Sequence, residues 1–285
     1  MSKEKGIIPL PQGGLGNQIF INIAGYVMSE HLECPLYLFN NANCNNCHST
    51  IEYKNNIFKN LGTHVNQSYN NGLNDFQNYS YHCLNHDQGF EPWDFSSVGK
   101  GLLLQSYYQY YPILESSENK IRSILLSGLE EFKIKLLQKY NEDELSESAF
   151  LHVRRGDYVT FSDRHFLQPM NYYKYCVEKL KTTSSVRKIY LLSDDIEWVK
   201  SQELFNDRTF FEPFECEDEL TSLTFMTLCK AGAISANSTF SWWGAFLGAH
   251  EKRSPIFVPK KWMLTNSQIR LFPKEWTVVE EKDFC

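Results

Sequence analysis

The sequence lacks a long apolar run, an export signal and an excess of basic residues. No stretch of its 285 residues approaches the roughly 18 consecutive apolar residues that a membrane-spanning helix needs. The polar start, Met1–Gly6, leads into only a short apolar stretch, which does not have the form of a signal peptide. The net charge of −6 argues against a general nucleic-acid-binding protein, which would carry a basic face. We therefore expect a cytoplasmic protein without a transmembrane segment, and the sequence leaves open peripheral contact with the inner face of a membrane.

The eight cysteines do not form a recognisable framework. The chain is neither short nor visibly secreted, so a disulfide scaffold is not expected. The segment Cys44–His48 has the spacing of a covalent haem attachment site, but such haems are attached outside the cytosol. No second pair of ligands at a matching spacing indicates a zinc site, and the sequence has no Asp-x-Asp motif. Nothing in these patterns calls for a resident metal or cofactor.

Alternating strand and helix patterns are present in both halves of the chain. In the first half we predict strands at 6–10, 36–39 and 102–105, helices at 18–32 and 112–140 (the latter divided near Ser127 and Gly128), and an acidic linker at 141–148. In the second half we predict strands at 149–153, 188–192, 209–211, 233–235 and 255–258, and helices at 169–182, 195–203, 218–230 and 238–249. This alternation predicts an α/β fold with a parallel sheet covered on both faces. We expect two domains, 1–147 and 148–285.

The most informative stretch follows the strand at 149–153, where two adjacent arginines precede a glycine and an aspartate. Ligands of open α/β folds bind at the carboxyl edge of the sheet, and guanidinium groups pair bidentately with phosphate oxygens. Gly156 allows a sharp turn, and Asp157 is either a partner of Arg155 or a base beside the phosphate. The alternative is that Arg154 and Arg155 are ordinary solvated surface groups.

Three further polar turns follow predicted strands, and we expect all four turns at one sheet edge. Ser193–Asp195 and Asn237–Trp243 lie in the second half of the chain. Ser238 or Thr239 would cap the next helix, whose N-terminal N–H groups can hold a phosphate. The fourth turn, Gly14–Gln18, lies in the first half and is one where the backbone can approach a ligand closely.

Each turn also has an ordinary structural explanation. Asp194 can cap a helix, and Trp242 and Trp243 can belong to the core. The glycine turn lacks the third glycine and the acidic follow-up of a dinucleotide site, and it lacks the lysine of a P-loop. Taken together, the four turns favour a nucleotide that carries a diphosphate.

The same turns resemble the signature motifs of the α-1,2-fucosyltransferases, glycosyltransferase family 11. The resemblance is carried by Gly13–Gln18, His152–Tyr158 and Asn237–Trp243, in this order and spacing, and it spans about residues 7–260. The second and third motifs are specific, whereas the glycine turn alone is not. The sequence departs from the family at Ile21–Ala24, where Gln-Tyr-Ala is usual, and we expect local repacking of that helix.

The resemblance implies a GT-B arrangement of two facing Rossmann-like domains, with the nucleotide-sugar site in the cleft between them. Domain 1–147 would bind the acceptor and domain 148–285 the donor, GDP-β-L-fucose. The implied reaction inverts C1 and transfers fucose to the 2-hydroxyl of a terminal galactose in an oligosaccharide or surface glycan, without a metal or any other cofactor. Acceptor choice should differ in the weakly patterned residues 40–100.

The resemblance also implies roles for individual residues. Arg154, helped by Arg155, would stabilise the departing pyrophosphate. Asp157 is the nearest candidate for the base, and Asp163 and His165 are its rivals. The donor would be contacted by Gly14, Gly16, Asn17, His152, Arg154, Asp194, Asn237, Ser238 and Thr239, with His152 and Asp194 toward the guanine and ribose.

Two other functions fit the same motifs. One is transfer of a different sugar from GDP by an enzyme of similar fold. The other is a noncatalytic carbohydrate- or nucleotide-binding module. The intact pair Arg154 and Arg155 favours an enzyme, because a degenerate binding module would be free to lose it.

Overall fold

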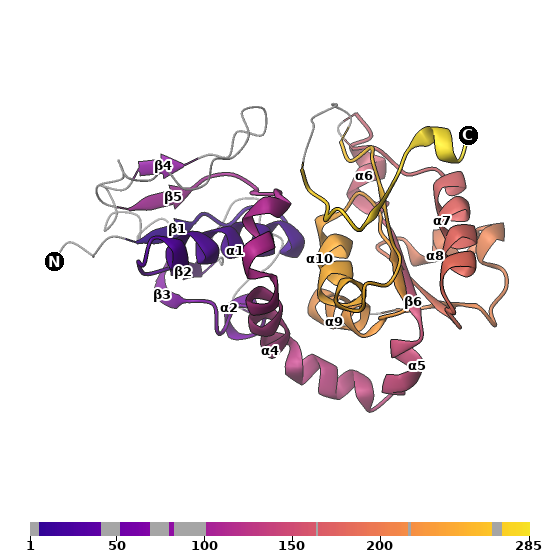
Figure 1. Ribbon diagram of the computed structural model, residues 1–285, viewed down its shortest axis with the longest axis horizontal. Helices are drawn as coiled ribbons and strands as arrows, with labels where there is room; N and C mark the ends of the chain where they lie inside the picture. The colour runs from indigo at the N-terminus through magenta and orange to yellow at the C-terminus, as the bar shows by residue number, and fades with distance from the viewer. Residues whose placement is uncertain are drawn as a thin grey trace. The chain divides into compact units, whose positions relative to one another are not determined.

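The computed structural model describes residues 6–40, 52–68, 80–82, 101–163, 165–215, 218–263 and 270–285. The chain divides into two compact units (Figure 1), the first comprising Met1–Glu130 with Ser267–Leu271 and the second Glu131–Asn266 with Phe272–Cys285. The first strand of the second unit begins at Ala149. The division at 147/148 stays a prediction, and the segment 44–48 with its haem-like spacing lies outside the described residues.

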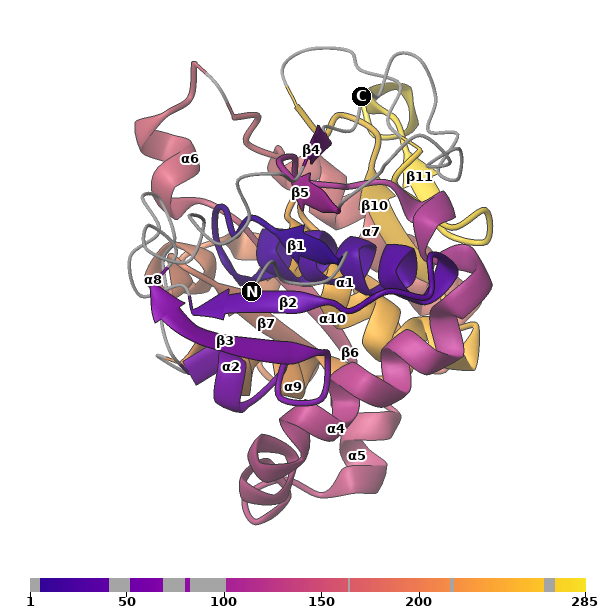
Figure 2. The same cartoon turned by 90° about the vertical axis from the view of Figure 1, so that its left-hand side faces the viewer.

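Within the described residues, the strands of the first unit pair in parallel and lie in two groups. β1 (Ile7–Pro9), β5 (Leu102–Leu104) and β4 (Ser80–His82) form a three-stranded sheet in the order β1-β5-β4. β2 (Tyr37–Asn40) pairs with β3 (Thr63–Ser68), and Figure 2 shows these two strands running side by side. The described part of this unit includes the helices α1 (Leu15–His31), α2 (Glu52–Asn55) and α4 (Glu118–Leu137), the last of which continues into the second unit. 3-10 turns at Tyr111–Ile113 and Glu115–Ser117 precede α4.

Helix α4 is continuous, so the predicted division near Ser127 and Gly128 is wrong. A Cβ atom at Gly128 would lie 2.6 Å from the carbonyl oxygen of Asn56 and 2.7 Å from Cα of Ile57. The glycine therefore allows close packing of two backbones and does not end the helix.

The predicted linker at 141–148 is also partly helical. It contains α5 (Glu142–Ser146). The side chain of Asn141 caps α5 by accepting a hydrogen bond from the N–H of Glu144 at 3.0 Å. This cap fixes where the helix begins.

The second unit contains one six-stranded parallel sheet in the order β11-β10-β9-β6-β7-β8. Its strands are β6 (Ala149–Val153), β7 (Ile189–Ser193), β8 (Phe211–Pro213), β9 (Gly232–Ile234), β10 (Ile256–Pro259) and β11 (Thr277–Val279). The chain moves outward from β6 through β7 to β8 and then returns to place β9 on the other side of β6. This reversal between β6 and β9 is a topological switch point, where α/β sheets bind their ligands.

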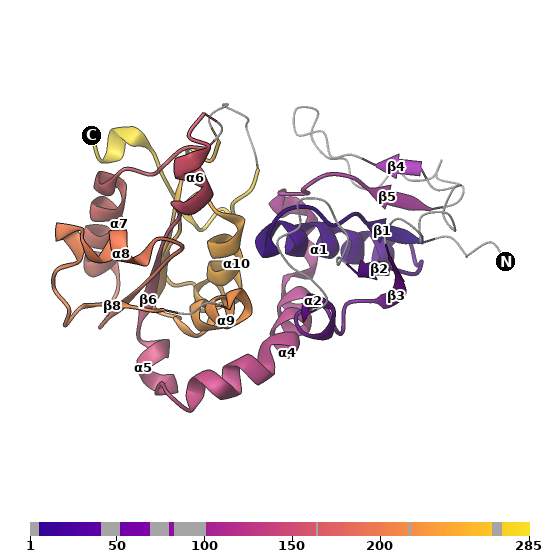
Figure 3. The same ribbon diagram turned by 180° about the vertical axis from the view of Figure 1, so that it is seen from behind.

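Helices cover both faces of this sheet, as Figures 1 and 3 show. They are α6 (Gly156–Thr160), α7 (Met170–Thr183), α8 (Ile196–Lys200), α9 (Glu219–Leu228) and α10 (Thr239–Leu247), with 3-10 turns at Glu203–Phe205, Ala249–Lys252 and Glu281–Asp283. Successive side chains of a strand point to opposite faces. Leu151 and Val153 belong to a buried core with residues of α7 and α8, whereas His152 lies 5.9 Å from the ring of Phe240 on α10.

Candidate active site at the carboxyl edge of the second sheet

Three of the four predicted polar turns come together at one sheet edge. They follow β7, β6 and β9, which are neighbours in the six-stranded sheet. The glycine turn follows β1, which belongs to the sheet of the first unit. The expectation that all four share one edge is therefore wrong, because each unit builds its own sheet.

Arg154 is held in this turn by two carboxylates. Its Nη2 donates to Oδ1 of Asp157 at 2.7 Å, and its Nη1 lies 3.0 Å from Oδ2 of Asp194. The side chain of Arg154 remains 33% exposed. The structure thus presents a guanidinium group that is fixed on one side and open to solvent on the other.

The neighbouring arginine is anchored differently. Nε of Arg155 donates to Oδ2 of Asp195 at 3.0 Å. Its guanidinium carbon lies 3.7 Å from the centroid of the Trp198 ring, the geometry of a cation–π contact. The side chain of Arg155 is therefore tied to Asp195 and Trp198, whereas the guanidinium of Arg154 is held by Asp157 and Asp194.

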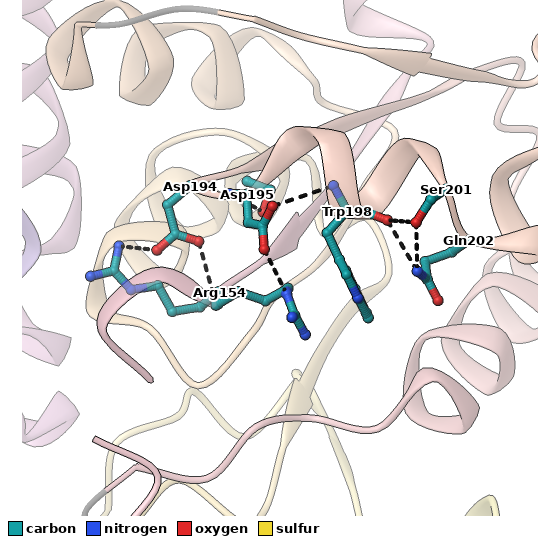
Figure 4. A network of polar contacts seen from close by, with 8 residues as sticks. Arg154, Asp194, Asp195, Trp198, Ser201 and Gln202 are labelled. Carbon is teal, nitrogen blue, oxygen red and sulfur yellow. Dashed lines mark hydrogen bonds and ion pairs between the residues drawn. The ribbon is translucent and has the colours of Figure 1, made fainter. Parts of the chain in front are cut away.

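Asp194 links the two arginines. Oδ1 accepts the backbone N–H of Arg155 at 2.8 Å while Oδ2 pairs with Arg154, as the dashed lines of Figure 4 show. Gly156 makes room for it, because a Cβ there would lie 2.5 Å from Oδ2 of Asp194. The helix cap considered for Asp194 is instead supplied by Asp195, whose side chain accepts from the N–H of Trp198.

Tyr158 connects the turn after β6, Arg154–Asp157, to the turn after β9. We call Arg154–Asp157 the arginine turn. The hydroxyl of Tyr158 donates to the carbonyl oxygen of Asn237 at 2.9 Å, across the switch point. The Arg154 guanidinium carbon lies 5.5 Å from the Tyr158 ring centroid, and His165 stacks on that ring at 4.2 Å. Burial raises the pKa of Tyr158 to about 12, so the phenol keeps its proton and stays a donor at working pH.

Asn237 has a structural role in the turn after β9. Its side chain is buried, and Nδ2 donates to the carbonyl oxygens of Phe166 at 2.9 Å and Trp262 at 3.0 Å. These bonds fix the chain that leads into α10. The buried Trp242 and Trp243 pack edge to face, in agreement with the reading of both as core.

The start of α10 is suited to an anion. Ser238 occupies the N-cap position, but its side chain makes no capping hydrogen bond, and Thr239 is the first helical residue. The first N–H groups of a helix and its dipole together favour a negative ligand. This helix start follows β9, directly beside β6 and its arginines.

His152 is buried in β6, and its Nδ1 has no hydrogen-bond partner in the described structure. Burial, followed by the charge of Arg154, lowers the pKa of His152 to about 3. The imidazole is therefore neutral at working pH. Its unpaired ring nitrogen makes His152 a candidate for a polar contact with a ligand, in keeping with its predicted role.

The glycine turn of the first unit is held by amide groups. Nε2 of the buried Gln18 donates to the carbonyl oxygen of Gly13 at 2.8 Å, and Nε2 of Gln109 donates to Oδ1 of Asn17 at 3.0 Å. Gly13 has φ +69°, a conformation that favours glycine. Gly14 is the N-cap of α1, and Gly16 lies in its first turn.

Sequence patterns missed four residues that support these turns. They are Gln109, Tyr158 in its supporting role, Asp195 as the cap of α8, and Trp198. Asp195 and Tyr158 belong to the sequence motifs themselves, so a role for each could have been proposed from the sequence. Gln109 and Trp198 carry no local signal, because each is brought to its turn by the tertiary fold.

The described residues show neither a metal cluster nor a membrane-spanning helix. No group of three or more His, Cys, Asp or Glu side chains among them is arranged to hold a metal ion. Among the same residues, no helix combines the length and apolar character that spanning a membrane requires.

Comparison with known proteins gives a family and several relatives. A profile described as glycosyl transferase family 11 matches residues 48–280. The O-antigen biosynthesis glycosyltransferase WbnK of Escherichia coli is 29% identical over 193 residues, which cover 63% of this chain and 61% of WbnK. An α-1,2-colitosyltransferase of Escherichia coli is 31% identical over 48% of this chain and 49% of its own length. A galactoside 2-α-L-fucosyltransferase of Caenorhabditis elegans is 26% identical over 51% and 42% of the two chains. In each case the match covers less than two thirds of the relative's length.

Solved structures share the fold. The fucosyltransferase NodZ from Bradyrhizobium superposes with a TM-score of 0.55 at 14% identity, covering 86% of this chain and 94% of NodZ. The apo-form of POFUT1 gives a TM-score of 0.52 at 13% identity, covering 90% of this chain and 98% of POFUT1. With the parallel sheets of both units, this likeness confirms the predicted α/β, GT-B-like fold class.

Proposed function

The chain belongs to glycosyl transferase family 11, and on that premise we propose that it transfers L-fucose from GDP-β-L-fucose to the 2-hydroxyl of a terminal galactose. The acceptor would be an oligosaccharide or surface glycan, and C1 of fucose would be inverted. Relatives named for O-antigen biosynthesis, α-1,2-colitosyl transfer and galactoside 2-α-L-fucosyl transfer support this proposal.

One observation carries the proposal most directly, namely the position of Arg154 at the switch point. Arg154 directly follows β6, and the start of α10, whose N-cap side chain makes no capping hydrogen bond, follows the adjacent strand β9 of the same sheet. A diphosphate would meet the guanidinium of Arg154 from one turn and helix N–H groups from the other. A charge-assisted hydrogen bond of this kind contributes roughly 1.5–3 kcal/mol, and it accelerates the reaction to the extent that it strengthens as the leaving group gains charge.

We propose that GDP leaves without assistance from a metal. In this reading Arg154 neutralises the growing charge on the β-phosphate, Thr239 and Ser238 contribute the start of α10, and Arg155 supports Arg154. His152, neutral and unpaired at Nδ1, would offer a hydrogen bond to the base or ribose. The proposed donor contacts of Gly14, Gly16 and Asn17 stay a prediction for the first unit.

Asp157 is the proposed base. Its carboxylate pairs with Arg154 at 2.7 Å, and its side chain is 41% exposed. When Arg154 turns to the diphosphate, this carboxylate becomes available to accept the proton of the acceptor hydroxyl. His165 is a weaker candidate, because its ring is stacked on Tyr158.

A second donor has specific support. The relative named α-1,2-colitosyltransferase is 31% identical to this chain over 144 residues, and colitose is L-fucose without the 3-hydroxyl. Both sugars would present the same diphosphate to Arg154. The choice between them depends on contacts to the sugar ring and not on the arginine turn.

The test is a GDP-release assay with the purified protein in EDTA, using GDP-β-L-fucose with and without lactose. We expect release that depends on lactose, and proton NMR of the product should show an α-1,2 linkage. GDP-colitose in place of GDP-fucose tests the second donor in the same assay.

The controls separate the possible failures. Calorimetric binding of GDP without lactose-dependent release would retain the donor site and reject lactose as an acceptor. Turnover that requires a divalent cation would refute the metal-free mechanism. Absence of both release and GDP binding would overturn the assignment of the arginine turn and favour a binding module with another ligand.

A further inference from the structure

We infer that Trp198 is a positioning residue for the leaving-group site, acting through Arg155 and Asp194 on Arg154. The inference depends on the proposed role of Arg154 at the diphosphate. It gives Arg155 a specific task, since its side chain would anchor the turn to α8 while its backbone N–H orients Asp194. Trp198 itself would not touch the donor.

The contacts form an unbroken path. The Trp198 ring lies 3.7 Å from the guanidinium carbon of Arg155, and the backbone N–H of Arg155 donates to Oδ1 of Asp194 at 2.8 Å. The second oxygen of Asp194 then pairs with Nη1 of Arg154 at 3.0 Å. A displacement of Arg155 would therefore change the direction in which the Asp194 carboxylate holds Arg154.

Hydrogen bonds fix the backbone of Trp198 at both its N–H and its carbonyl group. Asp195 accepts the N–H of Trp198 at 3.3 Å and also binds Nε of Arg155 at 3.0 Å. The carbonyl oxygen of Trp198 accepts from Oγ of Ser201 at 2.7 Å and from Nε2 of Gln202 at 3.1 Å, as Figure 4 shows. So short a helix as α8 has little intrinsic stability, and these side-chain bonds hold it in place.

The net charge around Arg154 explains why the contact between Trp198 and Arg155 is needed. Arg154, Arg155, Asp157, Asp194 and Asp195 together carry a net charge of −1, from two cations and three anions. An incoming diphosphate must draw Arg154 toward itself against these carboxylates. Without the Trp198 ring, the side chain of Arg155 would be held by its ion pair with Asp195, and its backbone N–H would hold Asp194 less firmly as Arg154 moves toward the diphosphate.

The experiment compares the binding of GDP and GMP by calorimetry in wild type, Trp198→Leu and Trp198→Phe. GMP lacks the β-phosphate, so it reports the rest of the nucleotide site. We expect Trp198→Leu to raise the Kd of GDP about three- to tenfold, in keeping with a partly desolvated cation–π contact. The Kd of GMP should change little, and Trp198→Phe, which keeps a ring, should lie close to wild type.

Phe210→Leu is the matched control. Phe210 is another partly buried ring beside the same core, with Nζ of Lys181 4.2 Å from its centroid, but it has no link to Arg154 by the contacts above. It should leave both nucleotide affinities unchanged. If Trp198→Leu does not fold, Trp198→Met removes the same aromatic ring and keeps more of its apolar volume.

Two results would overturn the inference: equal weakening of GDP and GMP by Trp198→Leu, or no weakening of either. A separate result would refute the proposed function instead. If wild type binds no GDP, or if Arg154→Ala binds GDP as tightly as wild type, the diphosphate assignment itself fails.

Discussion

The turns after β1 and after β6 serve similar positions in their sheets but are held by different chemistry. Each follows a short buried strand and leads into a helix. The glycine turn is held by bonds between neutral amides, including Gln18 to Gly13 and Gln109 to Asn17. The arginine turn is held by ion pairs of Arg154 and Arg155 with three aspartates.

The glycine turn therefore has a backbone fixed by neutral hydrogen bonds, whereas the arginine turn is built from charged side chains. The glycine turn is held by hydrogen bonds between neutral groups, which have no counter-ion to exchange. Ion pairs at a half-exposed edge can exchange one partner for another, since each contributes little net stability in water. Changes in the arginine turn should therefore appear in turnover and GDP affinity, and changes in the glycine turn should appear first in stability.

The largest expected effect is that of Arg154→Ala. Loss of the guanidinium removes the charge proposed to stabilise the leaving group, and we expect kcat to fall about 10²–10³-fold, as for other preorganised donors. Arg154→Lys should recover part of this loss, because it keeps the charge but not the planar fork. Thermal unfolding should be nearly unchanged. A near-normal kcat for the alanine variant would show that Arg154 does not stabilise the leaving group. The expected difference between the two turns, turnover for one and stability for the other, would then be wrong.

Asp194→Asn should have the next largest effect. The amide can still accept from the N–H of Arg155, but it no longer attracts Arg154, so we expect kcat to fall about ten- to a hundredfold. Steady-state kinetics with GDP-fucose would measure this. Asp207→Asn is the control, because Asp207 also accepts a backbone N–H and a side-chain donor, both from Thr209, elsewhere in the same unit. Equal effects of the two substitutions would contradict a specific role for Asp194.

Much of the second unit was predictable because its strands are apolar and its helices have clear limits. The strand at 149–153 was predicted with its observed bounds. The helix predicted at 169–182 is found at Met170–Thr183. The short helix α6 was missed, because its five residues, Gly156–Thr160, follow a motif that reads as a loop.

The candidate site was predictable in its residues but not in their partners. Local pattern placed Arg154, Asp194 and Asn237 at strand ends, and the parallel topology then brings their turns together. It could not show that Asp194 contacts both arginines, since this depends on β6 and β7 being adjacent in register. For the same reason, Gln109 and Trp198 could not have been assigned without the fold.

Gly13→Ala tests the expectation that changes in the glycine turn affect stability more than GDP binding. Gly13 has φ +69°, and an added Cβ would lie 2.6 Å from Nδ2 of Asn17, so we expect a loss of about 1–3 kcal/mol in stability. The melting temperature should fall, whereas the Kd of GDP should change less than for Gly156→Ala, which displaces Asp194. If Gly13→Ala instead weakens GDP binding at an unchanged melting temperature, the glycine turn has a role in ligand binding beyond shaping the backbone.

The last prediction concerns pH and distinguishes two buried polar side chains. Gln18 does not titrate and is bonded to the backbone of the glycine turn, whereas His152 is buried with a pKa lowered to about 3. In the unfolded chain a histidine takes up a proton near pH 6.5, and His152 in the folded protein does not. Its contribution to stability is therefore complete above about pH 6.5 and is lost as the pH falls toward 3, at about 1.4 kcal/mol per pH unit.

His152→Gln isolates this contribution from that of the other seven histidines, out of eight in the chain. Urea unfolding between pH 7 and 5 should show a steeper loss of stability in wild type than in the variant, because only wild type has a buried imidazole that protonates on unfolding. Gln18→Leu should leave the pH slope at its wild-type value, although it lowers stability at every pH. Parallel slopes for wild type and His152→Gln would mean that His152 is protonated, or reaches water, in the folded protein. The pH sensitivity would then not belong to the arginine turn.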